Sequence, residues 1–184
     1  MSKTSRQSGG DPPAVLSRDY KPLKFTGFLS DMWFITRRPF SIIRMARGTP
    51  VAPAFRERLM LAVTAVTGCR YCSWAHTGAA LRSGISKDEV SGLLIGSVDD
   101  CPPDEAIAVL YAQHWADSDG RPDPEARERL IQSYGADTVN TIDVILHSIR
   151  IGNYIGIFHE RLLRRIPVLG RGGRGGSTTT QIDA

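Results

Sequence analysis

Apolar residues recur at intervals of three and four along almost the whole chain, which is the spacing of an α-helix. No window of four to eight residues alternates between apolar and polar side chains cleanly enough to predict a strand. The pattern predicts helices over residues 28–46, with an interruption near Pro39, and over 53–67, 69–83, 86–96, 103–117, 123–134 and 136–165. We therefore expect an all-α protein, folded as a compact single-domain bundle of about six to seven helices.

Residues that typically start and stop helices support several of these boundaries. Ser86 followed by Glu89 has the spacing of a capping box, in which side chains bond to the free amides at a helix start. Gly84 stands where the preceding helix should end, because glycine adopts the left-handed conformation of a helix terminus. Pro103 and Pro124 suit the first turn of a helix, where the N–H that proline lacks has no intrahelical partner.

Composition divides the chain into three parts. Residues 1–13 are rich in Ser, Gly, Pro and charged side chains, and we expect a flexible N-terminal arm there. Residues 170–184 are rich in Gly and Arg and predict a flexible tail. The chain of 184 residues is long enough for one domain with a substantial core, which we place at residues 14–169.

Charge and cysteine content suggest a cytoplasmic protein. The formal net charge is +4, but five arginines and no acid fall between residues 161 and 176, so the rest of the chain sums to −1. No basic face with interleaved aromatics is evident, so we expect no nucleic-acid partner. Three cysteines do not make a secreted disulfide framework, and the N-terminus has no apolar signal-peptide core. Uncharged apolar stretches of about 18 residues are missing too, so we expect no membrane partner.

Two segments carry features of close packing. Residues 53–67 are apolar almost all round, which predicts a helix at the centre of the bundle, and Glu57 lies inside it. In the last predicted helix, Gly152 and Gly156 are four residues apart, a spacing that lets another helix approach the backbone closely. Because Arg150 and Glu160 are charged, we expect tight packing in a soluble protein here and not a membrane dimer.

One cluster of reactive residues specifies chemistry. Glu57, Cys69, Cys72 and His76 form the pattern E-x11-C-x2-C-x3-H. In a helix the last three fall within about 60° of one another, because successive residues rotate by about 100°. Two sulfurs and an imidazole on one stripe are the groups that a thiol redox site uses. The pattern therefore predicts thiol chemistry at the start of the helix over 69–83.

A thiolate is the reactive form of cysteine, so the site needs groups that stabilise negative sulfur or take up its proton. Cys69 follows Gly68 at the start of a helix, where free amides favour an anion. His76 lies one turn from Cys72 and can act as its base, so we predict that Cys72 attacks the substrate and that Cys69 then closes a disulfide with it. Glu57 is expected to orient the imidazole of His76 and to relay protons.

Two other interpretations of the cysteines stay open at this point. Unpaired cysteines in an apolar helix are often plain packing residues. Alternatively, C-x2-C with a following histidine supplies three ligands for zinc, although the second pair of ligands typical of such sites is missing from the sequence.

Other polar and aromatic residues have weaker roles in the prediction. Tyr71 and Trp74 flank the cysteines and are candidates for shielding the site from solvent or guiding a substrate. Asn153 and His159 in the last helix are candidates for completing the pocket. We expect the third thiol to be a spectator, and the remaining histidines to be surface or hydrogen-bonded core residues: Cys101, His114, His147 and His159.

Residues 55–90 resemble the carboxymuconolactone decarboxylase and alkyl hydroperoxidase D-like family. In its hydroperoxidase branch a glutamate precedes C-x2-C by about a dozen residues and a histidine follows by four, which corresponds to Glu57, Cys69, Cys72 and His76. The best-known members carry a second histidine between the cysteines, where this chain has Arg70-Tyr71.

The resemblance implies an all-helical domain that assembles as a homo-oligomer, commonly a trimer or hexamer, and that reduces an organic hydroperoxide or hydrogen peroxide. It implies a redox-active Cys69–Cys72 disulfide without a bound cofactor, reduced by an external dithiol such as a lipoyl-protein or another thiol carrier. We therefore expect a thiol-dependent peroxidase or disulfide reductase of antioxidant defence. Two alternatives remain, namely lactone decarboxylation in a cysteine-independent pocket, and a non-catalytic helical oligomer that binds a metal or a protein partner.

Overall fold

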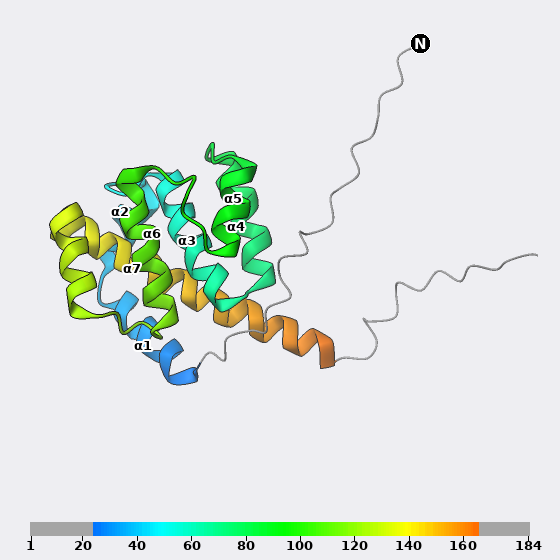
Figure 1. Ribbon diagram of the computed structural model, residues 1–184. Helices are drawn as coiled ribbons and strands as arrows, with labels where there is room; N and C mark the ends of the chain where they lie inside the picture. The colour runs from blue at the N-terminus through cyan, green and yellow to red at the C-terminus, as the bar shows by residue number, and fades with distance from the viewer. Residues whose placement is uncertain (1–23, 166–184) are drawn as a thin grey trace, which may run out of the picture.

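The computed structural model describes residues 24–165, and this part of the chain is built of helices without a strand (Figure 1). The helices are α1 (Phe25–Thr36), α2 (Pro39–Arg47), α3 (Pro53–Thr67), α4 (Arg70–Arg82), α5 (Lys87–Ile95), α6 (Pro103–Asp117) and α7 (Pro124–Arg165). The predicted all-α fold is confirmed. The arm predicted at 1–13 and the tail predicted at 170–184 lie outside the described residues.

The helix boundaries agree with those expected from the sequence to within a few residues. The predicted interruption near Pro39 separates α1 from α2, which begins at Pro39 itself. Within α7, Gly135 has a φ of 75° and a ψ of 155°, which are not helical, so both helices predicted over 123–134 and 136–165 are present. Ser86 caps α5 by accepting the amide of Glu89 at 3.1 Å, as their spacing predicted.

The central helix is α3, as its apolar sequence predicted. Residues such as Leu59, Leu61 and Val63 are completely buried, although they point in different directions around the helix. α3 packs against α4, α5, α6 and α7, and the long second part of α7 runs across the molecule (Figure 1). Polar side chains of α3 therefore meet partners from several helices.

Arg58 of α3 is one of these buried polar side chains. Its guanidinium donates to Glu89 of α5 at 2.5 Å and to Glu105 of α6 at 2.9 Å. Because a buried charge that loses its partner is strongly destabilising, these contacts fix how α5 and α6 are placed on the central helix.

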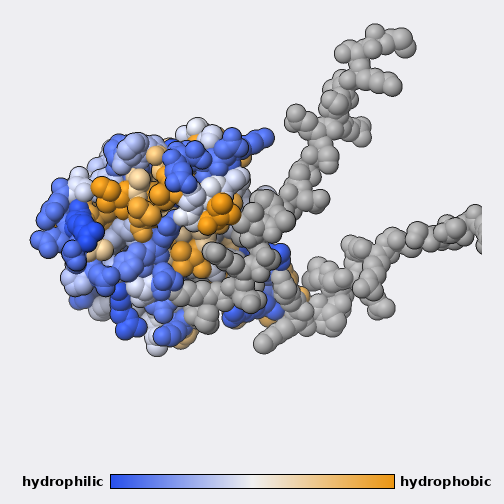
Figure 2. Space-filling model, in the orientation of Figure 1, coloured by the Kyte–Doolittle hydropathy of each residue, from blue (hydrophilic) through white to orange (hydrophobic). Residues whose placement is uncertain are grey.

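Apolar side chains also reach the outer surface. Figure 2 shows them gathered over α6 and its neighbours, and on that helix Ile107 and Leu110 are 47% and 50% exposed. Asp104 and Glu105 stand in the first turn of the same helix, so this apolar surface has acidic residues beside it.

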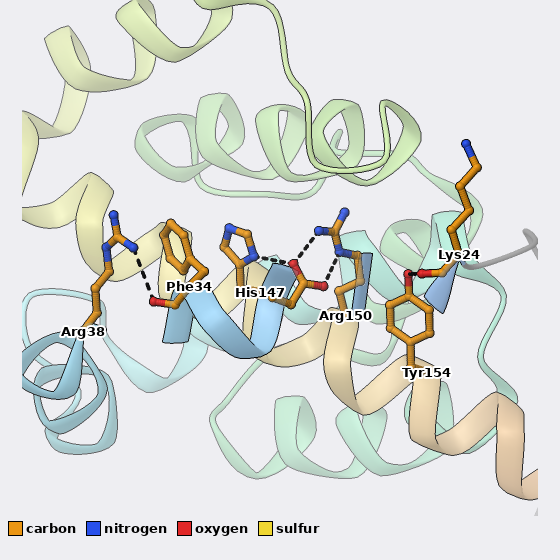
Figure 3. Close-up of polar contacts among 7 residues, drawn as sticks. Lys24, Phe34, Arg38, His147, Arg150 and Tyr154 are labelled. Carbon is orange, nitrogen blue, oxygen red and sulfur yellow. Dashed lines mark hydrogen bonds and ion pairs between the residues drawn. The ribbon is translucent and has the colours of Figure 1, made fainter. Parts of the chain in front are cut away.

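A buried charged cluster attaches α1 to α7. Asp31 of α1 is fully buried and accepts hydrogen bonds from His147 Nδ1 at 2.5 Å and from Arg150 Nε at 2.6 Å. Figure 3 shows the side chains of His147, Arg150 and Tyr154 directed toward α1, and the Tyr154 hydroxyl donates to the Lys24 carbonyl at 2.5 Å. His147 is thus a hydrogen-bonded core residue, as predicted, and α1 is held firmly along its inner side.

Candidate active site

The two cysteines lie at the N-terminal end of α4. α3 ends at Thr67, Gly68 turns the chain with a φ of 75°, and Cys69 is the N-cap of α4. The left-handed backbone at this turn is one that glycine adopts without strain. The sulfur of Cys69 accepts the amide of Cys72 at 3.3 Å. The predicted position of Cys69 at a helix start is therefore confirmed, and one free amide of that start already binds its sulfur.

Both sulfurs lie against the backbone of α7 at Gly156. A β-carbon added to Gly156 would stand 2.7 Å from Sγ of Cys69 and 3.3 Å from Sγ of Cys72. The cysteines are reduced and are 1% and 5% exposed, respectively. The close approach predicted for the glycine pair is thus found at Gly156, whereas a β-carbon at Gly152 would meet nothing within 4 Å. Glycine at position 156 leaves the space that lets two sulfurs converge.

A hydrogen bond between the two thiols separates their acidities. The contact with the Cys72 thiol lowers the pKa of Cys69; the amides of Cys72 and Tyr71 act in the same direction, and burial opposes them. The same bond, followed by burial, raises the pKa of Cys72. In the reduced pair the negative charge therefore favours Cys69. The spacing to His76 predicts that Cys72 attacks, whereas the contact between the two thiols, which the sequence does not show, favours the charge on Cys69.

Glu57 of α3 meets His76 of α4 inside the protein. His76 Nδ1 lies 2.8 Å from Glu57 Oε2, and the other carboxylate oxygen accepts from Arg56 Nη2 at 3.2 Å. Burial acts to raise the pKa of Glu57, but the hydrogen bond and charge of His76, together with Arg56, hold it below its ordinary value. Glu57 is therefore a buried carboxylate that accepts the Nδ1 proton of His76 and fixes the orientation of the ring.

Asn153 of α7 holds the end of α3, and this end directly precedes the cysteines in the chain. Its Nδ2 donates to Thr67 Oγ1 at 2.7 Å, and its Oδ1 accepts from Thr64 Oγ1 at 3.4 Å. Asn153 is fully buried and lies one turn before Gly156 on the same helix. It was a candidate for completing the pocket, and these contacts give it a positioning role, because they set the spacing of α3 and α7 at the sulfurs.

Two residues beside the sulfurs were not assigned to the site from the sequence. The sequence indicates Gly156 only as a packing residue and Glu160, one turn later, only as a charged residue of the same helix. Glu160 lies close enough for its charge to act on Cys69, and its carboxylate pairs with Arg70 Nη1 at 3.9 Å. Their four-residue spacing places both on one face of α7, but the sequence does not show that this face meets the cysteines.

The remaining candidates lie outside the site or at its edge. Tyr71 and Trp74 are 63% and 71% exposed, so they flank the cysteines without covering them. His159 is exposed and adds nothing to a pocket. Burial above all, and then Glu89, raises the pKa of Cys101 to about 11, so this thiol stays protonated at neutral pH. Within residues 24–165, no three His, Cys, Asp or Glu side chains converge in a way that could hold a metal ion.

Comparison with known proteins shows which family a part of this chain resembles. No curated protein and no solved structure matches it significantly. Residues 33–114 match the model of the carboxymuconolactone decarboxylase family. The matched segment runs from α1 into α6 and contains Glu57, both cysteines of the pair and His76, but it ends before the part of α7 that carries Gly156. Residues 33–114, fewer than half of the 184 residues, are therefore similar to the carboxymuconolactone decarboxylase family, a family that includes enzymes, as the resemblance of residues 55–90 predicted.

Proposed function

We propose that this protein is a thiol-dependent peroxidase or disulfide reductase with Cys69 and Cys72 as its redox pair. The main support is that both sulfurs, at the start of α4, lie close together against Gly156 of α7. Buried thiols that serve only in packing do not require a second thiol, a bound helix amide and a lowered pKa at one of the two sulfurs. These features are what the first chemical step of a dithiol peroxidase needs.

In the proposed reaction a thiolate of the pair attacks the outer oxygen of a hydroperoxide. The O–O bond breaks, the sulfur becomes a sulfenic acid, and an alcohol leaves with one proton, or water in the case of hydrogen peroxide. The sulfur of the second cysteine then displaces the sulfenic hydroxyl group, which forms the Cys69–Cys72 disulfide and releases water. An external dithiol, such as a lipoyl-protein, reduces this disulfide and is itself oxidised to a disulfide.

The Glu57–His76 pair supplies the proton transfers in this proposal. His76 lies one turn after Cys72 on α4, and the carboxylate at its Nδ1 fixes the orientation of the ring. The ring is thus suited to take the proton that the sulfurs give up and to return it to the leaving oxygen. Because Arg70 and Tyr71 stand between the cysteines, the mechanism uses one imidazole and not two.

We further propose that the protein works as a homo-oligomer in a reducing compartment such as the cytoplasm, where thiol donors regenerate the pair. The organic or inorganic peroxide is the substrate, and no bound cofactor takes part. Lactone decarboxylation, after which the matched family is named, is the alternative function. Activity measurements on cysteine variants separate these two functions.

Hydroperoxide consumption with a small dithiol as electron donor tests the proposal. We expect turnover by the unmodified protein, a drop to the background rate in both Cys69→Ser and Cys72→Ser, and full turnover in Cys101→Ser. The last variant is the matched control because Cys101 is also buried but lies outside the site. Full turnover in Cys69→Ser or Cys72→Ser would contradict a two-thiol mechanism. Lactone decarboxylation that survives replacement of both cysteines would identify the protein as a decarboxylase.

A further inference from the structure

The outer face of α1 carries large apolar side chains where a surface helix ordinarily carries polar ones. Phe25, Leu29 and Trp33, spaced by four residues, are 71%, 53% and 63% exposed, and Met32 beside them is 39% exposed. The one charged residue of α1 is Asp31, which is fully buried on the inner side. The outer face of this helix is therefore apolar and without charge.

Helix α2 also exposes large apolar side chains. Phe40 and Ile43 of α2 are 80% and 45% exposed, and both α1 and α2 pack on α7. We call this surface the α1–α2 face, and its apolar members are Phe25, Leu29, Met32, Trp33, Phe40 and Ile43. Six large apolar side chains are thus exposed on two consecutive short helices, and water solvates such side chains poorly.

Arginines stand beside the α1–α2 face. Between residues 24 and 47 the chain has five cations and one acid, the buried Asp31. Lys24 and Arg44 pair with Asp119 and Asp137, which leaves Arg37, Arg38 and Arg47 outside these ion pairs. The guanidinium of Arg37 lies 4.4 Å from the centre of the Trp33 ring, so charged and apolar groups stand side by side. A face with this composition is complementary to an apolar layer under a negatively charged surface.

We propose that the α1–α2 face docks this protein on the surface of an anionic lipid membrane. The apolar side chains enter the boundary between headgroups and acyl chains, and the arginines contact lipid phosphates. The attachment is peripheral, since no helix within residues 24–165 has the length and apolarity needed to cross a bilayer.

Charge and side-chain type favour lipid over the other occupants of such a face. A second copy that docked through the same face would bring two sets of arginines together, which is unfavourable, so we assign the proposed homo-oligomer to another surface, such as the apolar one on α6. Nucleic acid would use the arginines and stack on Trp33 and Phe40, but the aliphatic Leu29, Met32 and Ile43 offer no stacking surface to a base. Acyl chains and headgroups accept all of these side chains.

The α1–α2 face and the thiol site use different sides of α7. Tyr154 points toward α1, as its hydrogen bond to Lys24 shows, whereas Gly156 faces the two sulfurs. Residues two positions apart in a helix point in directions that differ by about 200°. Docking through α1 and α2 therefore leaves the thiol site free, and changes to this face test membrane binding without touching the cysteines.

Flotation of the full chain with lipid vesicles tests this proposal. We expect co-flotation with phosphatidylcholine vesicles that contain phosphatidylserine, weak flotation with phosphatidylcholine alone, and loss of binding as salt is raised. Arg37→Gln with Arg47→Gln should lower the partition coefficient about fivefold for each arginine. Trp33→Ser with Phe40→Ser should abolish flotation. All variants retain the arginines of residues 161–176, so differences between them report on this face alone.

Trp74→Ser is the matched control, because Trp74 is as exposed as these aromatics but lies on α4. It should float like the unmodified protein, and circular dichroism should show equal helix content in all variants. Flotation of Trp33→Ser with Phe40→Ser at the unmodified level, or no flotation with anionic vesicles, would overturn the proposal. Self-association in ultracentrifugation that this double variant abolishes, without vesicle binding, would assign the face to a second copy. Binding of an RNA oligonucleotide in place of vesicles would assign it to nucleic acid.

Discussion

Replacing Gly156 by Ala is expected to disable the thiol pair while the helical fold persists. The added β-carbon would stand 2.7 Å from Sγ of Cys69 and 3.3 Å from Sγ of Cys72, well inside ordinary contact distance. At least one sulfur must then move, and a displacement of about 1 Å at a reacting group typically reduces the rate about a hundredfold. We therefore expect peroxide turnover to fall by about this factor, measured as hydroperoxide consumption with excess dithiol.

Gly152→Ala is the control for this experiment. It lies four residues earlier on the same helix, and its added β-carbon would meet nothing within 4 Å. This variant should keep full turnover and gain up to about 1 kcal/mol in stability, because alanine favours a helix more than glycine does. Thermal unfolding of both variants separates loss of chemistry from loss of fold. Equal turnover in the two variants would show that the sulfurs do not depend on the space at Gly156.

Replacing Glu57 by Gln is expected to slow peroxide reduction by about a hundredfold or more, since positioned acid–base groups contribute about 10²- to 10⁴-fold. Glutamine has nearly the same shape, but it carries no negative charge to hold the Nδ1 proton of His76. The cysteines should remain titratable by a thiol reagent, because the substitution leaves α4 and Gly156 in place. A single-turnover measurement over a range of pH provides the readout that a purely structural role would not change.

Glu128→Gln provides the comparison, because Glu128 is an exposed glutamate far along the chain from the site. It should react at the unmodified rate across the same pH range. If Glu57→Gln and Glu128→Gln gave matching rates and pH profiles, the Glu57–His76 contact would have to be a structural one.

Most of the fold could be predicted because helix starts and stops are local. Ser86 caps its helix through an amide three residues away, and Pro39 and Gly135 interrupt helices at their own positions. None of these signals depends on where the rest of the chain lies. For the same reason, the central position of α3 could be predicted from the apolar residues around its circumference.

The part of the site that lies on adjacent helices could also be predicted. Only Gly68 and Cys69 join α3 to α4, so the two helices lie side by side. Glu57 therefore contacts His76 although 19 residues separate them. The contribution of α7 could not be predicted, because Gly156 is 84 residues beyond Cys72 (156 − 72) and helical periodicity does not say which helices pair. The acidity of Cys69 depends on contacts that only the folded chain forms.

The same limit applies to α1. Its sequence is apolar on nearly every side, so the pattern does not reveal that Asp31 turns inward to His147 and Arg150, across 116 and 119 residues. Once Asp31 occupies the inner side, Phe25, Leu29 and Trp33 are left facing outward. A buried long-range ion pair thus determines which apolar residues the protein presents at its surface.

The most direct measurement is a map of disulfides after the reduced protein has reacted with one equivalent of an organic hydroperoxide. The proposed mechanism predicts that a Cys69–Cys72 disulfide forms, that one molecule of alcohol is released for each disulfide, and that Cys101 remains a free thiol. Retention of all three cysteines as thiols, or a disulfide that includes Cys101, would contradict it.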